Sequence, residues 1–187
     1  MALLARRASI LALLVLLALA LPSPASAKVA NEYDLKAAFL FHFAQFVEWP
    51  AEAMPNKSTP LTIGILGGDP FGKTLDAMVA NEAVRGHKLV VRRFREVGEA
   101  DSCQILFISP SEDARLGVIL SHLKGRSILT VGEGKGFALR SGIVGFVLSD
   151  RRLRLAVNLA AANASRLTIS SKLLRQSEIV GPAGLPE

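Results

Sequence analysis

The chain has 187 residues, of which 50% are hydrophobic and 20% are charged, and it carries a net charge of +6. A chain of this length suits one domain with a sizeable buried core. Its basic residues are interleaved with acids and form no long block, which argues against a nucleic-acid-binding protein. The single cysteine, Cys103, excludes an internal disulfide, and its place beside an apolar run predicts a buried, unreactive thiol.

Residues 1–27 have the pattern of a secretory signal peptide. Arg6 and Arg7 precede an apolar run that ends at Leu21, and Ala25–Ala27 supplies small residues at the cleavage positions. The run is shorter than the ~20 apolar residues that a transmembrane helix needs. We therefore expect cleavage after Ala27, export to the periplasm and no insertion of the mature chain into a membrane. The alternative is an uncleaved N-terminal anchor. Cleavage would lower the net charge from +6 to +4, because the segment holds two arginines and no acid.

A long helix is predicted from Tyr33 to Trp49, and Pro50 ends it. Its apolar residues that follow the 3.6-residue period are Leu35, Ala38, Phe39, His42, Phe43, Phe46 and Val47. Within this face we expect an inward stripe made of Leu35, Phe39, Phe43 and Phe46. Three apolar residues off this face, Leu40, Phe41 and Ala44, would leave a patch unless another part of the domain, a second copy of the chain or a partner covers it.

The rest of the chain alternates between short apolar strands and helices. The predicted strands are 61–66, 88–94, 104–108, 127–131, 143–148 and 153–157, and the predicted helices are 70–81, 111–123, 158–164 and 170–179. The last two strands are close enough to form a hairpin. This order predicts a single α/β domain at 28–180, with a mixed, mostly parallel sheet and helices on both faces. The Gly- and Pro-rich residues 181–187 are expected to form a flexible tail.

The segment Gly67–Thr74 matches the phosphate-binding pattern G-x-x-x-x-G-K-[ST], between a predicted strand and a predicted helix. In a P-loop, backbone amides would hold phosphate and Lys73 would reach the β and γ groups. Pro70 removes one such amide, and Asp69 places negative charge where phosphate would lie. A helix start with Asp69 as its cap explains the same residues. A P-loop NTPase is therefore the least favoured of the functions considered.

The other motifs that could carry chemistry are incomplete. Gly134 and Gly136 begin the pattern G-x-G-x-x-G, but Leu139 replaces its third glycine, so a flexible turn is expected there. Ser121 and Lys124 match S-x-x-K without its companion motifs, and the three histidines lack metal-ligand spacing. We expect neither catalytic residues nor a metal or cofactor site, and hence a protein that is not an enzyme.

With these elements in place, the chain resembles the YfiR family over nearly its whole length after the signal peptide. The strongest resemblance is the helix from Leu35 to Pro50. Further segments follow in the family's order: Ile63–Gly67, Asp69–Phe71, Cys103–Ile108, Leu129–Val131, Phe137–Ala138, Gly142–Ile143, Val157–Asn158 and Ile169–Leu174. Each segment alone is weak, but the series is specific. Ser141 departs from the family, which often has a glycine at this position.

The resemblance implies a periplasmic regulator. Known members bind the periplasmic sensor region of a membrane-anchored diguanylate cyclase and repress it, and their release raises cyclic di-GMP and promotes biofilm formation. Some members carry disulfides, but Cys103 has no partner cysteine, so a switch of that kind is not expected here. The alternative function is a periplasmic sensor that binds a small ligand.

The family has no established catalytic residues to carry over, so the candidate site is a partner-binding surface. Its residues are Leu40, Phe41 and Trp49. Phe41 departs from the face that the other aromatic residues define, and an exposed Trp49 would be a good anchor for a partner. Trp49 could equally close the core at the end of the helix. A homodimer is expected, since twofold dimers are the commonest oligomers.

Overall fold

The computed structural model describes residues 24–150 and 152–181, with side chains described from residue 32. The predicted signal peptide, except for residues 24–27, lies outside the described residues, as does the predicted tail beyond Gly181. Residues from Tyr33 onward belong to one compact unit, and the fold below is that of this unit. Within the described ranges, no helix is long and apolar enough to cross a membrane.

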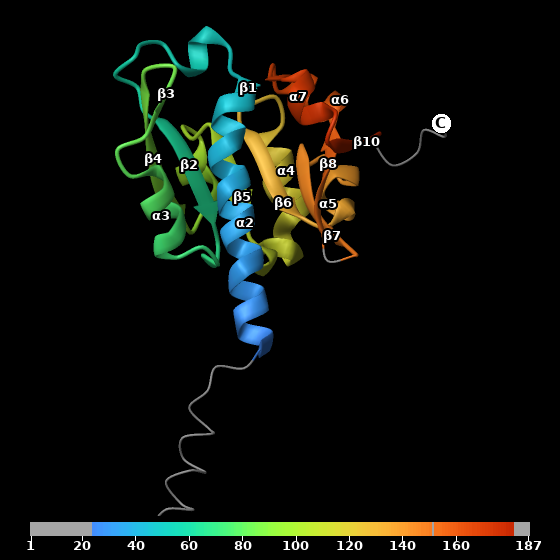
Figure 1. Ribbon diagram of the computed structural model, residues 1–187. Coiled ribbons are helices and arrows are strands. Elements are labelled where there is room, and N and C mark those ends of the chain that lie inside the picture. The colour runs from blue at the N-terminus through green and yellow to red at the C-terminus, as the bar shows by residue number, and fades with distance from the viewer. Residues whose placement is uncertain (1–23, 151, 182–187) are drawn as a thin grey trace, which may run out of the picture. The chain divides into compact units, whose positions relative to one another are not determined.

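An eight-stranded sheet forms the centre of the unit, in the order β10-β8-β7-β6-β5-β2-β4-β3 (Figure 1). Its strands are β2 (Leu61–Leu66), β3 (Ala83–Val84), β4 (His87–Phe94), β5 (Ile105–Ile108), β6 (Leu129–Glu133), β7 (Val144–Ser149), β8 (Arg152–Asn158) and β10 (Ser177–Val180). Within this sheet, the β3–β4 and β7–β8 pairs of the described strands are antiparallel and the other pairs are parallel. The predicted mixed, mostly parallel sheet is confirmed, as is the hairpin that joins its last two predicted strands.

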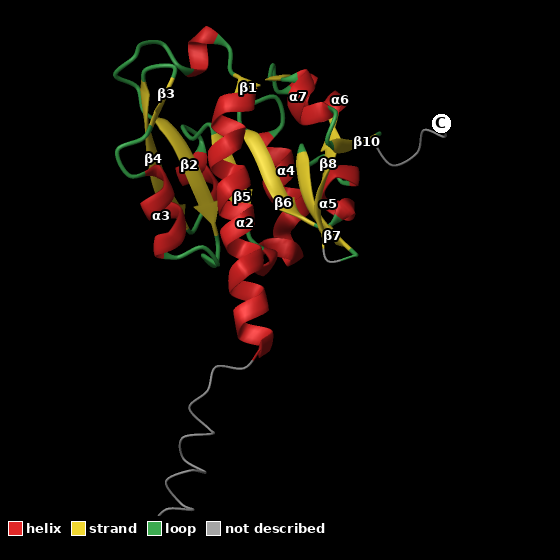
Figure 2. Cartoon of the chain, in the orientation of Figure 1, coloured by secondary structure: helices red, strands yellow, loops and turns green. Residues whose placement is uncertain are grey.

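Helices cover both faces of this sheet (Figure 2). They are α2 (Pro24–Phe46), α3 (Lys73–Val79), α4 (Leu116–Leu123), α5 (Lys135–Leu139), α6 (Leu159–Ala164) and α7 (Ser171–Leu174). Side chains that alternate along each strand supply two cores. Ile63 and Ile65 pack in the core that includes residues of α2, α3 and α7, whereas Leu66 packs on the opposite face with α4. The central strands read as continuous apolar runs because both of their faces are buried.

The inward face of α2 differs from the predicted stripe. Its buried residues are Lys36, Ala37, Leu40, Phe43 and Ala44, and the buried Val47 follows in β1. Leu35 is 45% exposed, and Phe39 and Phe46 are only half-buried, so Phe43 alone of the four predicted residues is fully inside. The helix is apolar on nearly all sides, and the sequence period therefore fits more than one stripe. The sheet selects the stripe that fits against it.

The end of the chain also differs from the prediction. The predicted helix at 170–179 ends after one turn in α7, and the chain then forms β10, which pairs in parallel with β8. A second, two-stranded sheet pairs β1 (Val47–Glu48) with β9 (Thr168–Ile169) and was not predicted. Both features depend on pairing between distant segments, which local sequence patterns do not reveal.

The stretch from Gly132 to Gly136 was predicted to be a flexible turn, but it contains the end of β6 and the start of α5. Phe137 explains two of the glycines around it. A Cβ atom at Gly132 would lie 2.2 Å from the Phe137 ring, and one at Gly142 would lie equally close to its other edge. These glycines make room for a buried aromatic ring in the core beside α4.

Candidate functional site

The strand order of the sheet reverses between β2 and β5. β2 continues through α3 to its neighbour β4, whereas β5 continues through α4 to β6 on its other side. The two helices lie on opposite faces of the sheet. Ligands of open α/β sheets bind at the carboxyl ends of the strands at such a point, so this crevice is the first place for a site.

The P-loop-like segment follows β2 at this crevice. The Oδ1 atom of Asp69 accepts hydrogen bonds from the backbone nitrogens of Phe71, at 2.8 Å, and Gly72, at 3.2 Å. The backbone nitrogen of Gly68 donates to the Oγ of Ser111 at 2.9 Å. These are amides that a P-loop would offer to phosphate. Because the chain's own side chains already accept from them, the structure argues against a P-loop NTPase.

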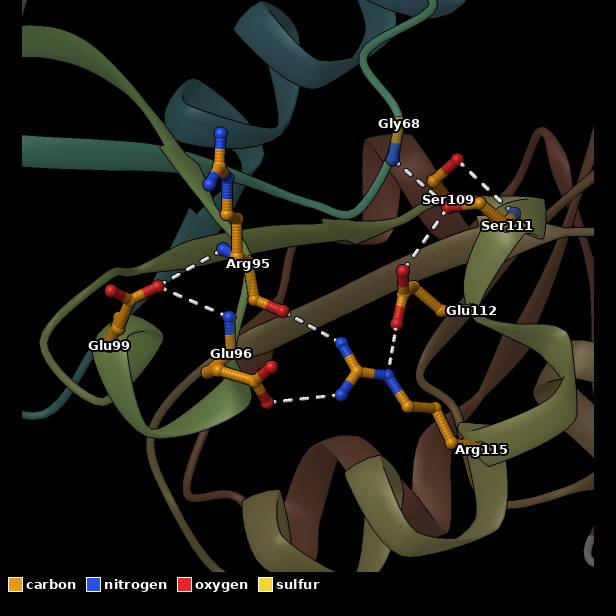
Figure 3. A network of polar contacts seen from close by, with 8 residues as sticks. All are labelled: Gly68, Arg95, Glu96, Glu99, Ser109, Ser111, Glu112 and Arg115. Carbon is orange, nitrogen blue, oxygen red and sulfur yellow. Dashed lines mark hydrogen bonds and ion pairs between the residues drawn. The ribbon is translucent and has the colours of Figure 1, made fainter.

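A carboxylate of the chain itself, that of Glu112, lies in a polar network at this crevice (Figure 3). Glu112 is only 8% exposed, and its Oε1 accepts a hydrogen bond from the Ser111 hydroxyl at 3.2 Å. Arg115 pairs with Glu112 and, through Nη1, with Glu96 at 3.0 Å. A Cβ atom at Gly67 would lie 2.4 Å from the Glu112 carboxylate, so glycine is required there. The crevice is thus a closed polar network that connects β2, β4 and β5.

Two further ion pairs join the segment from Asp69 to Asp76 to β4. Arg93, on β4, contacts Oδ2 of Asp69 at 2.9 Å and Oδ2 of Asp76 at 2.6 Å. The hydrogen bond from Arg93 holds the pKa of Asp76 below its ordinary value, and the same bond raises the pKa of Arg93. The prediction that Asp69 caps this helix is wrong, because α3 begins at Lys73 with Gly72 at its N-cap. The Asp69 carboxylate instead accepts hydrogen bonds within the turn before the helix.

The structure also places the residues of the other candidate motifs. No three His, Cys, Asp or Glu side chains within it come together as a metal site. Ser121 and Lys124 are exposed near the end of α4, and neither has a base or acid within hydrogen-bond distance among the described residues. Cys103 is 2% exposed, and burial raises the pKa of its thiol to about 12, which confirms the prediction of a buried, neutral thiol.

The three predicted partner-binding residues fall in different environments. Leu40 is fully buried against the sheet, so the expectation that it contributes to an exposed patch is wrong. Another part of the same domain covers it, and the same holds for Ala44. Phe41 is half-buried on one flank of α2, with its ring centroid 5.4 Å from that of His42. Part of its ring is accessible to a second molecule.

Trp49 is half-buried where α2 ends. Its Nε1 donates a hydrogen bond to the backbone oxygen of Gln104 at 3.1 Å, which joins this end of the helix to the start of β5. It also lines a small pocket of about 180 Å³ with Met54 and His87. The tryptophan therefore closes the core and keeps one accessible edge, so a contact with a partner through it remains a proposal.

A groove on the other flank of α2 was missed from the sequence. It has a volume of about 550 Å³ and lies between α2 and α7. We call it the α2–α7 groove; its residues are Phe39, His42, Gln45, Phe46, Lys172, Leu173, Arg175 and Gln176. Lys172 and Arg175 are exposed, and no acid lines the groove. No local signal could have revealed it, since its two walls are more than a hundred residues apart in the sequence.

Comparisons with solved structures give only distant likenesses. The ABC domain from Streptococcus pneumoniae in complex with L-Trp has a TM-score of 0.47 and 11% identity, covering 64% of this chain and 55% of that one. A conserved domain protein from Vibrio cholerae has a TM-score of 0.47 and 13% identity, covering 69% of this chain and 56% of that one. The chain thus spans little more than half of either protein, and neither likeness bears on function.

No curated protein matches the chain. A family model does match it, over residues 33–178, which is most of the sequence and nearly all of the compact unit. The matched range runs from the start of the inward face of α2 into β10, so it includes the other seven strands of the eight-stranded sheet whole and the first half of β10. The model describes YfiR/HmsC-like proteins, and the chain belongs to this family.

Proposed function

We propose that this protein is a periplasmic regulator that binds the periplasmic sensor region of a membrane-anchored diguanylate cyclase and represses it. It thereby controls cyclic di-GMP and biofilm formation. The observation that carries the proposal is the family match over residues 33–178. The occupied crevice at the carboxyl ends of the strands supports a binding role over nucleotide hydrolysis, since its phosphate-binding amides are already used.

The α2–α7 groove is the surface that we assign to the cyclase. Phe39 and Phe46 offer partly exposed aromatic rings, and buried aromatic contacts commonly dominate interface energies. Lys172 and Arg175 add two positive charges without a carboxylate in the groove. A partner segment that presents an apolar side chain flanked by acidic residues complements this surface in shape and in charge.

The opposite flank of α2 is assigned to a second copy of the chain. Phe41 is half-buried there. In a twofold dimer the Phe41 side chains of the two copies would contact each other and become fully buried. Trp49 is close in sequence to this flank and has an accessible edge. On this proposal the homodimer and the complex with the cyclase use different sides of one helix.

Co-expression of the protein with a candidate cyclase from a neighbouring gene tests the proposal. Repression should lower cellular cyclic di-GMP, and the two proteins should co-purify from detergent-solubilised membranes. The double substitution Lys172→Glu and Arg175→Glu should release repression, because like charges would face the acidic partner. Lys88→Glu, at an exposed position of β4, is the control charge reversal and should repress normally. If the double variant still repressed the cyclase, the groove would not be the binding surface. If the unaltered chain did not co-purify with the cyclase, the cyclase would not be its partner.

A further inference from the structure

A second large pocket lies away from α2, between α4, α6 and the loop that precedes β7. Its volume is about 470 Å³, within the usual range for small-molecule sites. The apolar part of its wall comes from Leu120, Leu123, Ile143 and Ala161. This lining can accommodate a hydrocarbon group of about the size of a single ring.

The charged side chains that line this pocket are all positive. Lys124 and Arg140 line it, no acid does, and neither cation forms an ion pair with any residue in the described ranges. Two unpaired cations on one concave surface favour an anionic ligand.

Two hydroxyl groups lie on the same lining. Ser165 is 8% exposed as a residue, but its hydroxyl is not among the solvent-excluded side-chain oxygens of the described residues, so it is accessible from the pocket. Thr130 is 5% exposed, and its Oγ1 accepts from the backbone nitrogen of Ile143 at 3.0 Å, which leaves its own proton for donation. Both hydroxyls can donate to a hydrogen-bond acceptor that enters the pocket.

We propose that this pocket binds a small organic carboxylate with an apolar body. The carboxylate would accept hydrogen bonds from Arg140 and Ser165, with Lys124 adding positive charge, while the hydrocarbon part packs on the leucine and isoleucine side chains. The planar guanidinium of Arg140 matches a carboxylate in two parallel hydrogen bonds. The site is independent of the surfaces assigned above to the cyclase and the second copy, because it shares no lining residue with the α2–α7 groove.

Benzoate is a suitable probe, with benzamide as its neutral counterpart of the same shape and inorganic phosphate as an anion without an apolar body. Titration of the protein purified from the periplasm, followed by NMR chemical shifts or calorimetry, should show saturable benzoate binding and much weaker binding of the other two. Benzamide or phosphate binding as tightly as benzoate would overturn the assigned ligand class. So would the absence of saturable benzoate binding up to about 10 mM.

Substitutions locate the binding. Arg140→Gln should weaken benzoate binding about tenfold or more, as expected for a lost charge-assisted hydrogen bond. Ala164→Leu should abolish it by filling the pocket without altering any charge. Arg154→Gln removes an exposed arginine outside the pocket and is the matched control, for which binding should not change. All three positions are exposed, so the fold should tolerate these changes. Equal effects of the Arg140 and Arg154 substitutions would overturn the location.

Discussion

The Nζ atom of Lys36 lies 3.1 Å from Oε2 of Glu133, although the lysine side chain is only 2% exposed. This ion pair joins α2 to the last residue of β6. Tyr33 reinforces it, since its hydroxyl donates to Oε1 of Glu133 at 2.9 Å and its ring lies 4.4 Å from the Lys36 ammonium. The contacts hold the long helix across the carboxyl end of a central strand.

Removal of the carboxylate should therefore be costly. Glu133→Ala would leave the buried ammonium without this counter-charge and should lower the free energy of unfolding by about 3 kcal/mol. Lys36→Met keeps a similar volume without the charge and should be close to neutral. Chemical denaturation measures both. The two substitutions together should be more stable than Glu133→Ala alone, and a double variant that is less stable would show that the charge is not the cause.

The close approach of Gly132 to Phe137 gives a second prediction. A methyl group at Gly132 would overlap the ring, so Gly132→Ala should destabilise the fold by about 1–3 kcal/mol, the range for overpacking. Gly136→Ala is the control, because a Cβ there meets nothing within 4 Å and the residue lies inside α5. Thermal melting should show a lower Tm for the first variant and an equal or higher Tm for the second. Equal losses would mean that backbone freedom, and not the ring, requires glycine.

The Cys103 thiol should be inert in the folded protein. Burial raises its pKa from 9.0 to about 12, so the reactive thiolate is scarce at neutral pH. Alkylation by iodoacetamide at pH 8 should be slow without denaturant and rapid in guanidinium chloride. The same shift predicts a pH effect on stability: its contribution is complete below about pH 9 and is lost as the pH rises towards about 12. A Cys103→Ser variant should lack this alkaline component, and rapid alkylation of the native protein would contradict the burial.

Lys73→Ala should leave repression of the cyclase unchanged, and the protein should not bind ATP. The reason is that Asp69 and Ser111 already accept from the amides that phosphate would need. Lys73 itself is exposed. Calorimetric titration with Mg-ATP checks this prediction. Micromolar affinity that the substitution abolishes would restore the P-loop hypothesis.

Phe41 and Phe43 should respond differently to the same substitution. Phe43 is fully buried and its ring stacks 6.0 Å from that of Phe146, so Phe43→Glu should unfold the domain by forcing a charge into the core. Phe41→Glu should instead lower the oligomeric state and leave a cooperative thermal transition, because Phe41 is only half-buried. Light scattering and melting curves distinguish the two results. Loss of folding in both variants would make Phe41 a core residue and end its assignment to the dimer.

The sequence alone was sufficient for the fold class and for most of the strands. The strand at Leu61–Leu66 was predicted at its observed bounds, and the strand from Lys88 to Phe94 differs from β4 by one residue. The first is predictable because a buried central strand is a mainly apolar run between turn-forming residues, and the second because it is rich in Val and Leu. The prediction of an unreactive Cys103 followed from the same kind of local evidence.

Only the tertiary structure decided which side of α2 is buried, where the chain ends as β10, and which side chains meet at the pockets. α2 is apolar around most of its circumference, so its local pattern permits several orientations and only the surface of the sheet selects one. β10 is a strand because β8 offers it backbone partners. Ile179 and Val180 favour strands, but four residues that follow a helix are too short a pattern to predict one. Arg140 and Ser165, or Phe39 and Arg175, become neighbours only when segments distant in sequence pack together. Local periodicity predicts helices and strands, whereas the pockets of this protein lie between those elements.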